Sequence, residues 1–364
     1  MTAGDPVIAS GPVTVDVPAS SANLGAGFDA LALALDLADI FTVTRADDLP
    51  AGSIEVTVVG EGADVIPRDG SDRFSQALRR GLAEVDGPGA TGVAGGAWRV
   101  RMHNAIPVRR GLGSSAAATV GGLAAADLIF GGGLIAAERM LELATWFEGH
   151  PDNVAAALHG GFTVAVPVGD ASMDGPPRSD GAPPMSRSDA VPSLMSRSDP
   201  ARSPAAGFAL VRFEPPPDLL VVLFVPDRRL STGSMREILP ESVPRRDAVH
   251  NVARASLAVA ALASGRLDLL AAATEDRLHE PYRASVFPEL PRLIAAARGA
   301  GALGACLSGA GSSILAFADR PGLASDVAAA LELEASTVGL TGRAMVLRPR
   351  SQGVIGVDSG QLGQ

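Results

Sequence analysis

The stretch IPVRRGLGSSAAATVGGLAAA, residues 106–126, places two glycines directly before an alanine-rich run that predicts a helix. Gly111 and Gly113 allow the backbone to adopt conformations that other residues avoid and to approach a ligand closely. Ser114 and Ser115 open the expected helix, whose first amide groups have no partner within the helix. Such a turn binds anions through these amides and the aligned peptide dipoles, although serine is also an ordinary helix cap. The stretch therefore indicates a phosphate site, with a plain capped helix as the alternative.

The composition of the 364-residue chain excludes several other classes of protein. All 30 basic residues are arginines, whereas Walker A loops, protein-kinase folds and Schiff-base chemistry each require a lysine. A net charge of −10 without basic clusters argues against a nucleic-acid partner. The single cysteine, Cys306, rules out an intramolecular disulfide and offers no metal-ligand cluster. We expect no signal peptide and no membrane span, and we expect a cytoplasmic location.

Apolar periodicity divides the chain into two segments of mixed helix and strand. In the first segment, strands are expected near 13–17, 31–37, 40–45, 53–59, 97–106 and 160–168, and helices over 73–85, 114–130 and 134–148. In the second, strands are expected at 218–226 and 342–349, a strand-turn-strand unit at 302–318, and helices at 234–239, 246–263, 267–278, 289–299 and 323–334. The fold class indicated is α+β in both segments.

A polar stretch, 169–206, separates these two segments and differs from both in composition. It is rich in Pro, Ser, Asp and Gly, and the sequence MSRSD occurs at 185–189 and again at 195–199. A stretch with almost no large apolar residues cannot bury a core, which predicts disorder. The expected organisation is a first domain over 1–168, a disordered low-complexity insertion over 169–206, a second domain over 207–350 and a flexible tail over 351–364.

Three glycine-rich stretches occur in an order typical of one group of small-molecule kinases. PVRRGLGSSAA (107–117) resembles the phosphate-binding motif of the GHMP kinase superfamily. PASSANLGAGFDALALAL (18–35) resembles the first motif of the homoserine kinases within it, and LSGAGSSILAFA (307–318) is similar to its C-terminal glycine-rich motif. The resemblance implies a two-domain GHMP kinase fold, with an N-terminal ATP-binding α+β domain and a C-terminal ferredoxin-like α+β domain.

The resemblance also implies an activity and its cofactors. A member of this family transfers the γ-phosphoryl group of ATP, with Mg²⁺, to the side-chain hydroxyl of L-homoserine, giving O-phospho-L-homoserine and ADP in threonine biosynthesis. A GHMP kinase of the mevalonate or methylerythritol-pathway type and a non-catalytic ligand sensor of the same fold are the alternatives. We expect a small-molecule substrate and neither nucleic acid nor membrane as a partner, and the possibility of a homodimer is left open.

Matching positions imply which residues bind the two substrates. ATP is expected to contact Pro107, Val108, Arg109, Arg110, Gly111, Leu112, Gly113, Ser114, Ser115, Ala116 and Ala117. Homoserine is expected to contact Asn23, Asp29, His150, Thr232, Arg236 and Arg283. Asp29 would face the ammonium group of the amino acid, and the arginines suit its carboxylate because their planar fork binds bidentately.

The remaining matches concern the reaction itself. Glu142, eight residues before His150, is expected to bind Mg²⁺ together with Ser114, and phosphate oxygens and waters complete such a site. Asn153 is expected to face the substrate at the catalytic centre, where a side-chain amide cannot accept a proton. Phosphoryl transfer then depends on positioning and charge neutralisation rather than on a general base. Residues 71–77 depart from the family pattern near adenine, so the sequence names no adenine contact.

Overall fold

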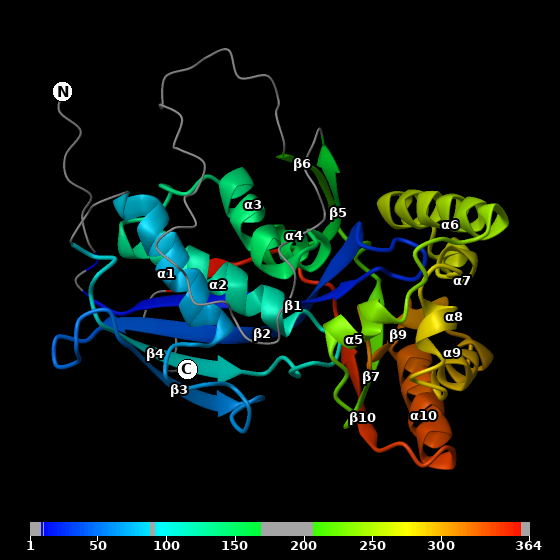
Figure 1. Ribbon diagram of the computed structural model, residues 1–364. Helices are drawn as coiled ribbons and strands as arrows, with labels where there is room; N and C mark the ends of the chain where they lie inside the picture. The colour runs from blue at the N-terminus through cyan, green and yellow to red at the C-terminus, as the bar shows by residue number, and fades with distance from the viewer. Residues whose placement is uncertain (1–8, 10, 88–91, 169–206, 358–364) are drawn as a thin grey trace.

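The computed structural model of the chain describes residues 9, 11–87, 92–168 and 207–357 (Figure 1). The expected insertion, 169–206, lies outside these residues, as does the end of the expected tail, 358–364. The described strands form two sheets, one of seven strands and one of four, with helices beside each. The α+β class is therefore confirmed. In the described ranges, no helix is long and apolar enough to cross a membrane.

The larger sheet is built mostly from the first half of the chain and appears in blue, cyan and green in Figure 1. Its strands are β1 (Val13–Ala22), β2 (Leu31–Arg45), β3 (Ile54–Gly60), β4 (Trp98–Asn104), β5 (Phe162–Val168), β6 (Gly207–Phe213) and β11 (Ile355–Val357). Their order is β11-β1-β2-β4-β3, and β5 pairs with both β2 and β6. Strand β1 thus lies inside the sheet, and its end delivers the chain to the turn of the opening motif.

Four helices of the first half lie together on one side of this sheet (Figure 1). They are α1 (Arg73–Asp86), α2 (Ser114–Ile129), α3 (Ala137–Glu148) and α4 (Asp152–His159). Helix α2 packs against β1 and against α1, and most of its alanines and glycines are buried. Alanine has the highest helix propensity, and its small side chain allows this close packing. The N-terminus of α2 is thereby fixed near the end of β1.

The second half of the chain forms the smaller sheet and its helices. The strands, in the order β10-β7-β9-β8, are β7 (Leu220–Pro226), β8 (Gly304–Leu307), β9 (Ile314–Ala318) and β10 (Gly342–Leu347). The helices are α5 (Thr232–Glu237), α6 (Arg245–Ser264), the 3₁₀ turn η1 (Leu267–Leu269), α7 (Leu270–Ala273), α8 (Glu280–Arg283), α9 (Leu290–Gly299) and α10 (Pro321–Thr337). Helices α9 and α10 pack against strands of this sheet.

One continuous apolar core joins the two sheets. The same cluster of buried side chains contains Val15 of β1, Val120 of α2, Leu223 of β7 and Phe317 of β9. A second cluster fills the space between the smaller sheet and helices α9 and α10. Because burial of apolar surface is the main stabilising contribution to folding, the shared core holds the two halves in a fixed relation. Sites formed from both halves can therefore be rigid.

Two short strands were not expected from the sequence. Strand β6 pairs with β5, and β11 pairs with β1 through Ile355 and Val357. Both lie outside the range 1–168 expected for the first domain, yet both complete its sheet. Residues 355–357 also fall in the tail that was expected to be flexible, and this part of that expectation is wrong. Strand β11 has only three residues, too few to show a recognisable alternation of apolar and polar side chains. It is defined by its pairing with β1, which lies over 300 residues away in the sequence.

The helix expected over 267–278 is instead interrupted. The chain forms η1 and α7, leaves helical structure after Ala273, and starts α8 at Glu280. The interruption follows from Asp276, whose carboxylate accepts hydrogen bonds from the amides of Leu278, His279 and Glu280. An aspartate that binds amides in this way favours a turn and a new helix start over helix continuation.

Candidate active site

A cavity of about 750 Å³ lies where the two halves of the chain meet. Residues of the turn after β1, of the loop before α2, of the α3–α4 connection and of the start of α5 line it, together with Arg283 and Gly309. The cavity thus brings together all three glycine-rich motifs that the sequence singled out. Of the eleven loop residues expected to contact ATP, the terminal two, Pro107 and Ala117, do not line the cavity.

The glycine loop before α2 leaves the first amides of that helix free of side-chain caps. Gly113 occupies the N-cap position in a left-handed conformation, and no side chain caps the helix. Neither glycine of the loop could carry a side chain. A Cβ atom on Gly111 would lie 2.0 Å from the carbonyl oxygen of Ser308, and one on Gly113 would lie 2.1 Å from Oγ of Ser20. Close packing against the third motif at Gly111 and against the first motif at Gly113 makes glycine necessary at both positions. The uncapped amides can bind an anion.

Two sets of hydrogen bonds anchor this loop and the chain before it. Asp39 accepts hydrogen bonds from the amides of Ala105 and Ile106, at 2.8 and 2.9 Å. Burial raises the pKa of Asp39 to about 7 despite these hydrogen bonds. Arg110 donates to the carbonyl oxygens of Pro226 and Asp227, each at 2.6 Å. The guanidinium of Arg110 therefore connects the loop to the end of β7.

The carboxylate that faces the loop is Glu148, which the sequence analysis did not single out. It is largely buried, and Oε1 accepts hydrogen bonds from the hydroxyls of Ser115 and Thr119, at 2.7 and 3.0 Å. The guanidinium of Arg73 lies 3.6 Å from the same oxygen. Glu148 and Ser115 both line the cavity, as does Ser114. A carboxylate and hydroxyls thus lie together at the start of α2.

Glu142, the expected metal ligand, lies elsewhere. It does not line the cavity, and its carboxylate pairs with Arg139 on the same helix at 3.0 Å. Six residues separate Glu142 from Glu148, which places their side chains about 120° apart around the axis of α3. Only one of the two can face α2, so the expected pairing of Glu142 with Ser114 does not form. The resemblance had matched Glu142 by its distance from His150 in the sequence, which does not show which carboxylate of α3 faces α2.

The turn after β1 is closed by Asn23. The Nδ2 group of Asn23 donates to the carbonyl oxygen of Gly309 at 2.9 Å, and Oδ1 accepts from the amide of Asp29 at 3.1 Å. Both residues have positive φ, of 70° and 57°, a conformation that Asn and Asp tolerate better than most residues. The two residues that the resemblance assigned to the substrate therefore hold the turn in an uncommon shape beside the third motif.

Asp29 and Arg236 pair with each other across the cavity. Nη1 of Arg236 donates to Oδ2 of Asp29 at 2.9 Å, and Nη2 donates to Oδ1. Burial lowers the pKa of Arg236, but the carboxylate of Asp29 outweighs it and raises that pKa above its ordinary value. The anion and the cation assigned to opposite ends of one substrate thus neutralise each other. The resemblance did not indicate this pairing.

Arg283 is almost completely buried but still lines the cavity. Its Nη1 donates to the carbonyl oxygen of Gly309 at 2.9 Å, and its Nε donates to that of Met235 at 3.3 Å. Among the described residues, Nη2 makes no hydrogen bond. Burial and the neighbouring charge of Arg236 lower the pKa of Arg283 to about 10. A desolvated guanidinium with one free edge is suited to an anionic group.

His150 and Asn153 lie at the start of α4, next to the loop. Nδ1 of His150 contacts Oδ1 of Asp152, and Oδ1 of Asn153 accepts a hydrogen bond from the hydroxyl of Ser20 at 2.9 Å. Burial opposes protonation of His150, but the charge of Asp152 outweighs it and raises the pKa of the imidazole. His150, Asp152 and Asn153 all line the cavity, and so does Thr232 at the start of α5.

Two buried polar atoms of residues that line the cavity lack hydrogen-bond partners. Within the described ranges, neither Oδ2 of Asp72 nor Oδ1 of Asn104 has a hydrogen-bond partner. Both residues line the cavity, beside Ile66 and Phe74. A buried acceptor without a partner costs free energy, so these atoms favour a ligand that carries N–H groups. The sequence had assigned no contact to these two residues.

Next to the cavity, Glu280 makes stability depend on pH. Its Oε1 accepts from the amide of Leu307 at 2.6 Å, and burial raises its pKa from 4.5 to about 8. Below pH 4.5 the folded and unfolded chains both hold the proton. Between pH 4.5 and 8 the unfolded chain alone ionises, so stability falls by about 1.4 kcal/mol per pKa unit of difference.

Glu280→Gln is therefore expected to flatten this pH dependence, because the amide keeps the acceptor for Leu307 and cannot ionise. The measurement is the melting temperature from about pH 5 to pH 8 for the wild type and the variant. The exposed Glu241→Gln is the control and should follow the wild type. A variant that loses stability over this range as steeply as the wild type would refute the role given to Glu280.

Comparisons with known proteins identify the family of the chain. Residues 74–161 match the GHMP kinases N terminal domain, and residues 258–336 match the GHMP kinases C terminal domain. The chain is 41% identical over 318 residues to a homoserine kinase of Rhodococcus opacus, covering 85% of this chain and 88% of that protein. It is 38% identical over 303 residues to a homoserine kinase of Moorella thermoacetica, covering 83% and 86% of the two chains.

A solved structure shares the fold. The crystal structure of homoserine kinase from Cytophaga hutchinsonii superposes with a TM-score of 0.74 at 24% sequence identity, covering 98% of this chain and 99% of that one. The expected two-domain architecture is confirmed by this match and by the two domain families. With relatives at about 40% identity over most of the chain, the protein belongs to the homoserine kinase family of GHMP kinases.

Proposed function

We propose that the protein transfers the γ-phosphoryl group of Mg-ATP to the side-chain hydroxyl of L-homoserine. The observation that carries the proposal is the arrangement of charges in one cavity. Asp29, Arg236 and Arg283 line this cavity together with the uncapped start of α2 and Glu148. A zwitterion with a hydroxyl on a short side chain matches the first group, and a polyphosphate matches the second.

The amino acid would bind by exchange of partners. Its ammonium group takes the place of Arg236 on Asp29. Its carboxylate then pairs with the guanidinium of Arg236, which has been released, and with the free edge of the Arg283 guanidinium. Both protein charges then keep a partner, whereas a ligand with only one charge leaves a buried group uncompensated. The cavity is therefore suited to an α-amino acid rather than to a sugar or a simple hydroxy acid.

ATP fits the remainder of the cavity. The amides at the start of α2 would bind its phosphates, as in other helix N-termini behind glycine turns. The partnerless acceptors on Asp72 and Asn104 suit the amino group of a base, with Ile66 and Phe74 beside them. We assign neither atom to a specific position on the base. The resemblance implies ATP as the phosphoryl donor. Asp72 and Asn104 offer hydrogen-bond acceptors for its base, for which the sequence had named no contact.

The residues present also fit Mg²⁺. This ion prefers oxygen ligands and takes only one or two carboxylates in such sites. Glu148 provides one carboxylate, with the hydroxyl of Ser115 at 2.7 Å and that of Ser114 in the same turn. We therefore assign the metal-ligand role expected of Glu142 to Glu148, with Ser115 as the nearer hydroxyl. When bound, the ion would neutralise charge on the transferred phosphoryl group.

The protein's own groups orient the hydroxyl rather than deprotonate it. Asn153 offers an amide at the loop, which cannot accept a proton, and Nδ1 of His150 is engaged with the carboxylate of Asp152. The hydroxyl oxygen of homoserine attacks the γ-phosphorus while the bond to ADP breaks. The hydroxyl proton passes to the phosphate or to solvent. Such a loose transition state needs alignment and charge neutralisation more than a base.

The test is an assay of ADP release with a panel of acceptors. L-Homoserine, L-threonine, mevalonate and galactose are each supplied with Mg-ATP at equal concentration. We expect homoserine to give the highest kcat/KM. A preference for mevalonate or galactose would contradict the proposal, and so would ADP release that no acceptor stimulates.

Arg236→Lys is expected to raise the KM for homoserine by about tenfold or more, because an ammonium group cannot reproduce the bidentate fork. The KM for ATP should stay within about twofold, since Arg236 lies at the amino acid end of the cavity. Arg229→Lys is the matched control, because Arg229 also binds an aspartate bidentately but does not line the cavity. Equal effects on both KM values would remove Arg236 from the amino acid site.

A further inference from the structure

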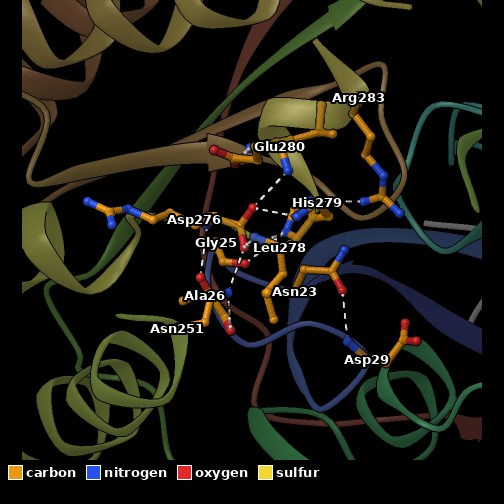
Figure 2. A network of polar contacts seen from close by, with 12 residues as sticks. Asn23, Gly25, Ala26, Asp29, Asn251, Asp276, Leu278, His279, Glu280 and Arg283 are labelled. Carbon is orange, nitrogen blue, oxygen red and sulfur yellow. Dashed lines mark hydrogen bonds and ion pairs between the residues drawn. The ribbon is translucent and has the colours of Figure 1, made fainter. Parts of the chain in front are cut away.

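A completely buried histidine joins the two halves of the amino acid site (Figure 2). His279 comes directly before α8, on the opposite half of the molecule from the turn formed by residues 23–29. Its Nε2 lies 2.8 Å from the carbonyl oxygen of Gly25, and its Nδ1 lies 3.0 Å from Nη1 of Arg283. His279 does not line the cavity, so it cannot touch a substrate there.

These two contacts determine which nitrogen carries the proton. The carbonyl of Gly25 can only accept, so Nε2 must donate to it. The guanidinium of Arg283 can only donate, so Nδ1 must accept from it. Only the neutral imidazole with its proton on Nε2 satisfies both neighbours. Burial favours the neutral imidazole, because it lowers the pKa of His279 to about 4 even though the charge of Asp276 acts to raise it.

The ring itself is held on several sides. The amide of His279 donates to Asp276 at 2.8 Å, and Asp276 also accepts from Nδ2 of Asn251 at 2.7 Å. The ring of Phe28 stacks on the imidazole with centroids 5.3 Å apart. Phe28 is in the turn next to Asp29, and its ring lies 5.5 Å from the guanidinium carbon of Arg283. The imidazole therefore contacts the turn twice, through its Nε2 proton and through its face.

We infer that His279 is a positioning residue that fixes Arg283 and the Asp29 turn relative to each other through its two ring nitrogens. The inference rests on the proposed function, because it assigns these two groups to the carboxylate and the ammonium group of the amino acid. Loss of either ring contact should weaken recognition of the amino acid and leave ATP binding unchanged. A role in packing alone would lower stability without this selectivity.

Two substitutions separate the two contacts. His279→Asn keeps an acceptor near Nδ1 for Arg283 but has no donor that reaches Gly25. His279→Gln keeps a donor near Nε2 for Gly25 but no acceptor for Arg283. We expect each variant to raise the KM for homoserine by about tenfold, the effect of losing one well-placed hydrogen bond, with the KM for ATP within about twofold. The exposed His103→Asn and His103→Gln serve as controls.

Analogues of the substrate then show which end of the site has loosened. His279→Gln should reduce the preference for homoserine over 2-aminobutane-1,4-diol, which lacks the carboxylate. His279→Asn should reduce the preference for homoserine over 4-hydroxybutanoate, which lacks the amine. If both preferences and both KM values match the wild type in folded variants, the positioning role is wrong. Absence of homoserine turnover in the wild type would instead refute the proposed function.

A measurement on the wild type covers the case in which the variants fail to fold. With ¹⁵N-labelled histidine, one imidazole should stay neutral with its proton on Nε2 down to about pH 5, because its pKa is about 4. Its Nδ1 signal should shift when homoserine is added and stay unchanged when ADP is added. If the His279 signal titrates near pH 6.5, or does not shift when homoserine is added, the inference is overturned.

Discussion

Glu148→Gln is expected to lower kcat with homoserine and Mg-ATP by about a hundredfold or more, because a metal ligand at a phosphoryl centre contributes several kcal/mol. The amide is nearly the same size and can still accept from Ser115 and Thr119, so the fold should persist. Only the negative charge is lost. The activity should recover partly at high Mg²⁺ concentration, because the variant binds the ion more weakly.

Glu142→Gln is the matched control on the same helix. Its carboxylate pairs with Arg139 at a half-exposed position, and such pairs contribute little to stability. We expect kcat and the Mg²⁺ dependence of this variant to match the wild type. The reverse result, a severe loss in Glu142→Gln with normal activity in Glu148→Gln, would contradict the metal assignment and restore the one expected from the sequence.

Gly111→Ala is expected to reduce kcat/KM by about a hundredfold and to destabilise the fold by several kcal/mol. The new Cβ would lie 2.0 Å from the carbonyl oxygen of Ser308, and 2.8 Å from the amide nitrogen of Gly311. Backbone atoms cannot move aside as the end of a side chain can. The loop must therefore separate from the third motif, which displaces the amides at the start of α2.

Gly52→Ala separates the effect of the contact from that of backbone conformation. Gly52 has φ of 76°, close to the 74° of Gly111, but a Cβ there meets nothing within 4 Å. The free energy of unfolding of Gly52→Ala should fall only by what an alanine in the left-handed conformation costs, about 1 to 2 kcal/mol. Its activity should be normal. Urea unfolding and steady-state kinetics on both variants give the comparison. Equal losses in the two would show that the contact with Ser308 is unimportant.

The features predicted correctly from the sequence depend on local patterns. The glycine turn and the alanine-rich helix are both encoded within residues 106–126, and the structure has them where they were expected. The matched residues Asn23, Asp29, Arg236 and Arg283 also meet in one cavity. Each belongs to a short motif whose geometry its neighbours determine. The motifs that carry the resemblance therefore contain most of the charged groups that line the cavity.

The features that were missed depend on contacts between distant residues. Glu148 could have been found from helix periodicity, since it is the carboxylate on α3 that faces α2. No local signal indicated His279, because its partner Gly25 lies 254 residues away in the sequence. Strand β11 is likewise defined by pairing with β1 rather than by its own three residues. Tertiary contacts decide such positions, and a single sequence shows them only through a resemblance.

The most direct test of the account is to identify the product in a competition. The protein receives Mg-ATP with L-homoserine, mevalonate and L-threonine at equal concentration, and the products are resolved by ³¹P NMR and mass spectrometry. The arrangement of Asp29, Arg236 and Arg283 beside the start of α2 predicts one phosphomonoester, on the side-chain oxygen of homoserine, in amounts equal to ADP. Phosphomevalonate as the main product, or free phosphate equal to ADP, would contradict the account.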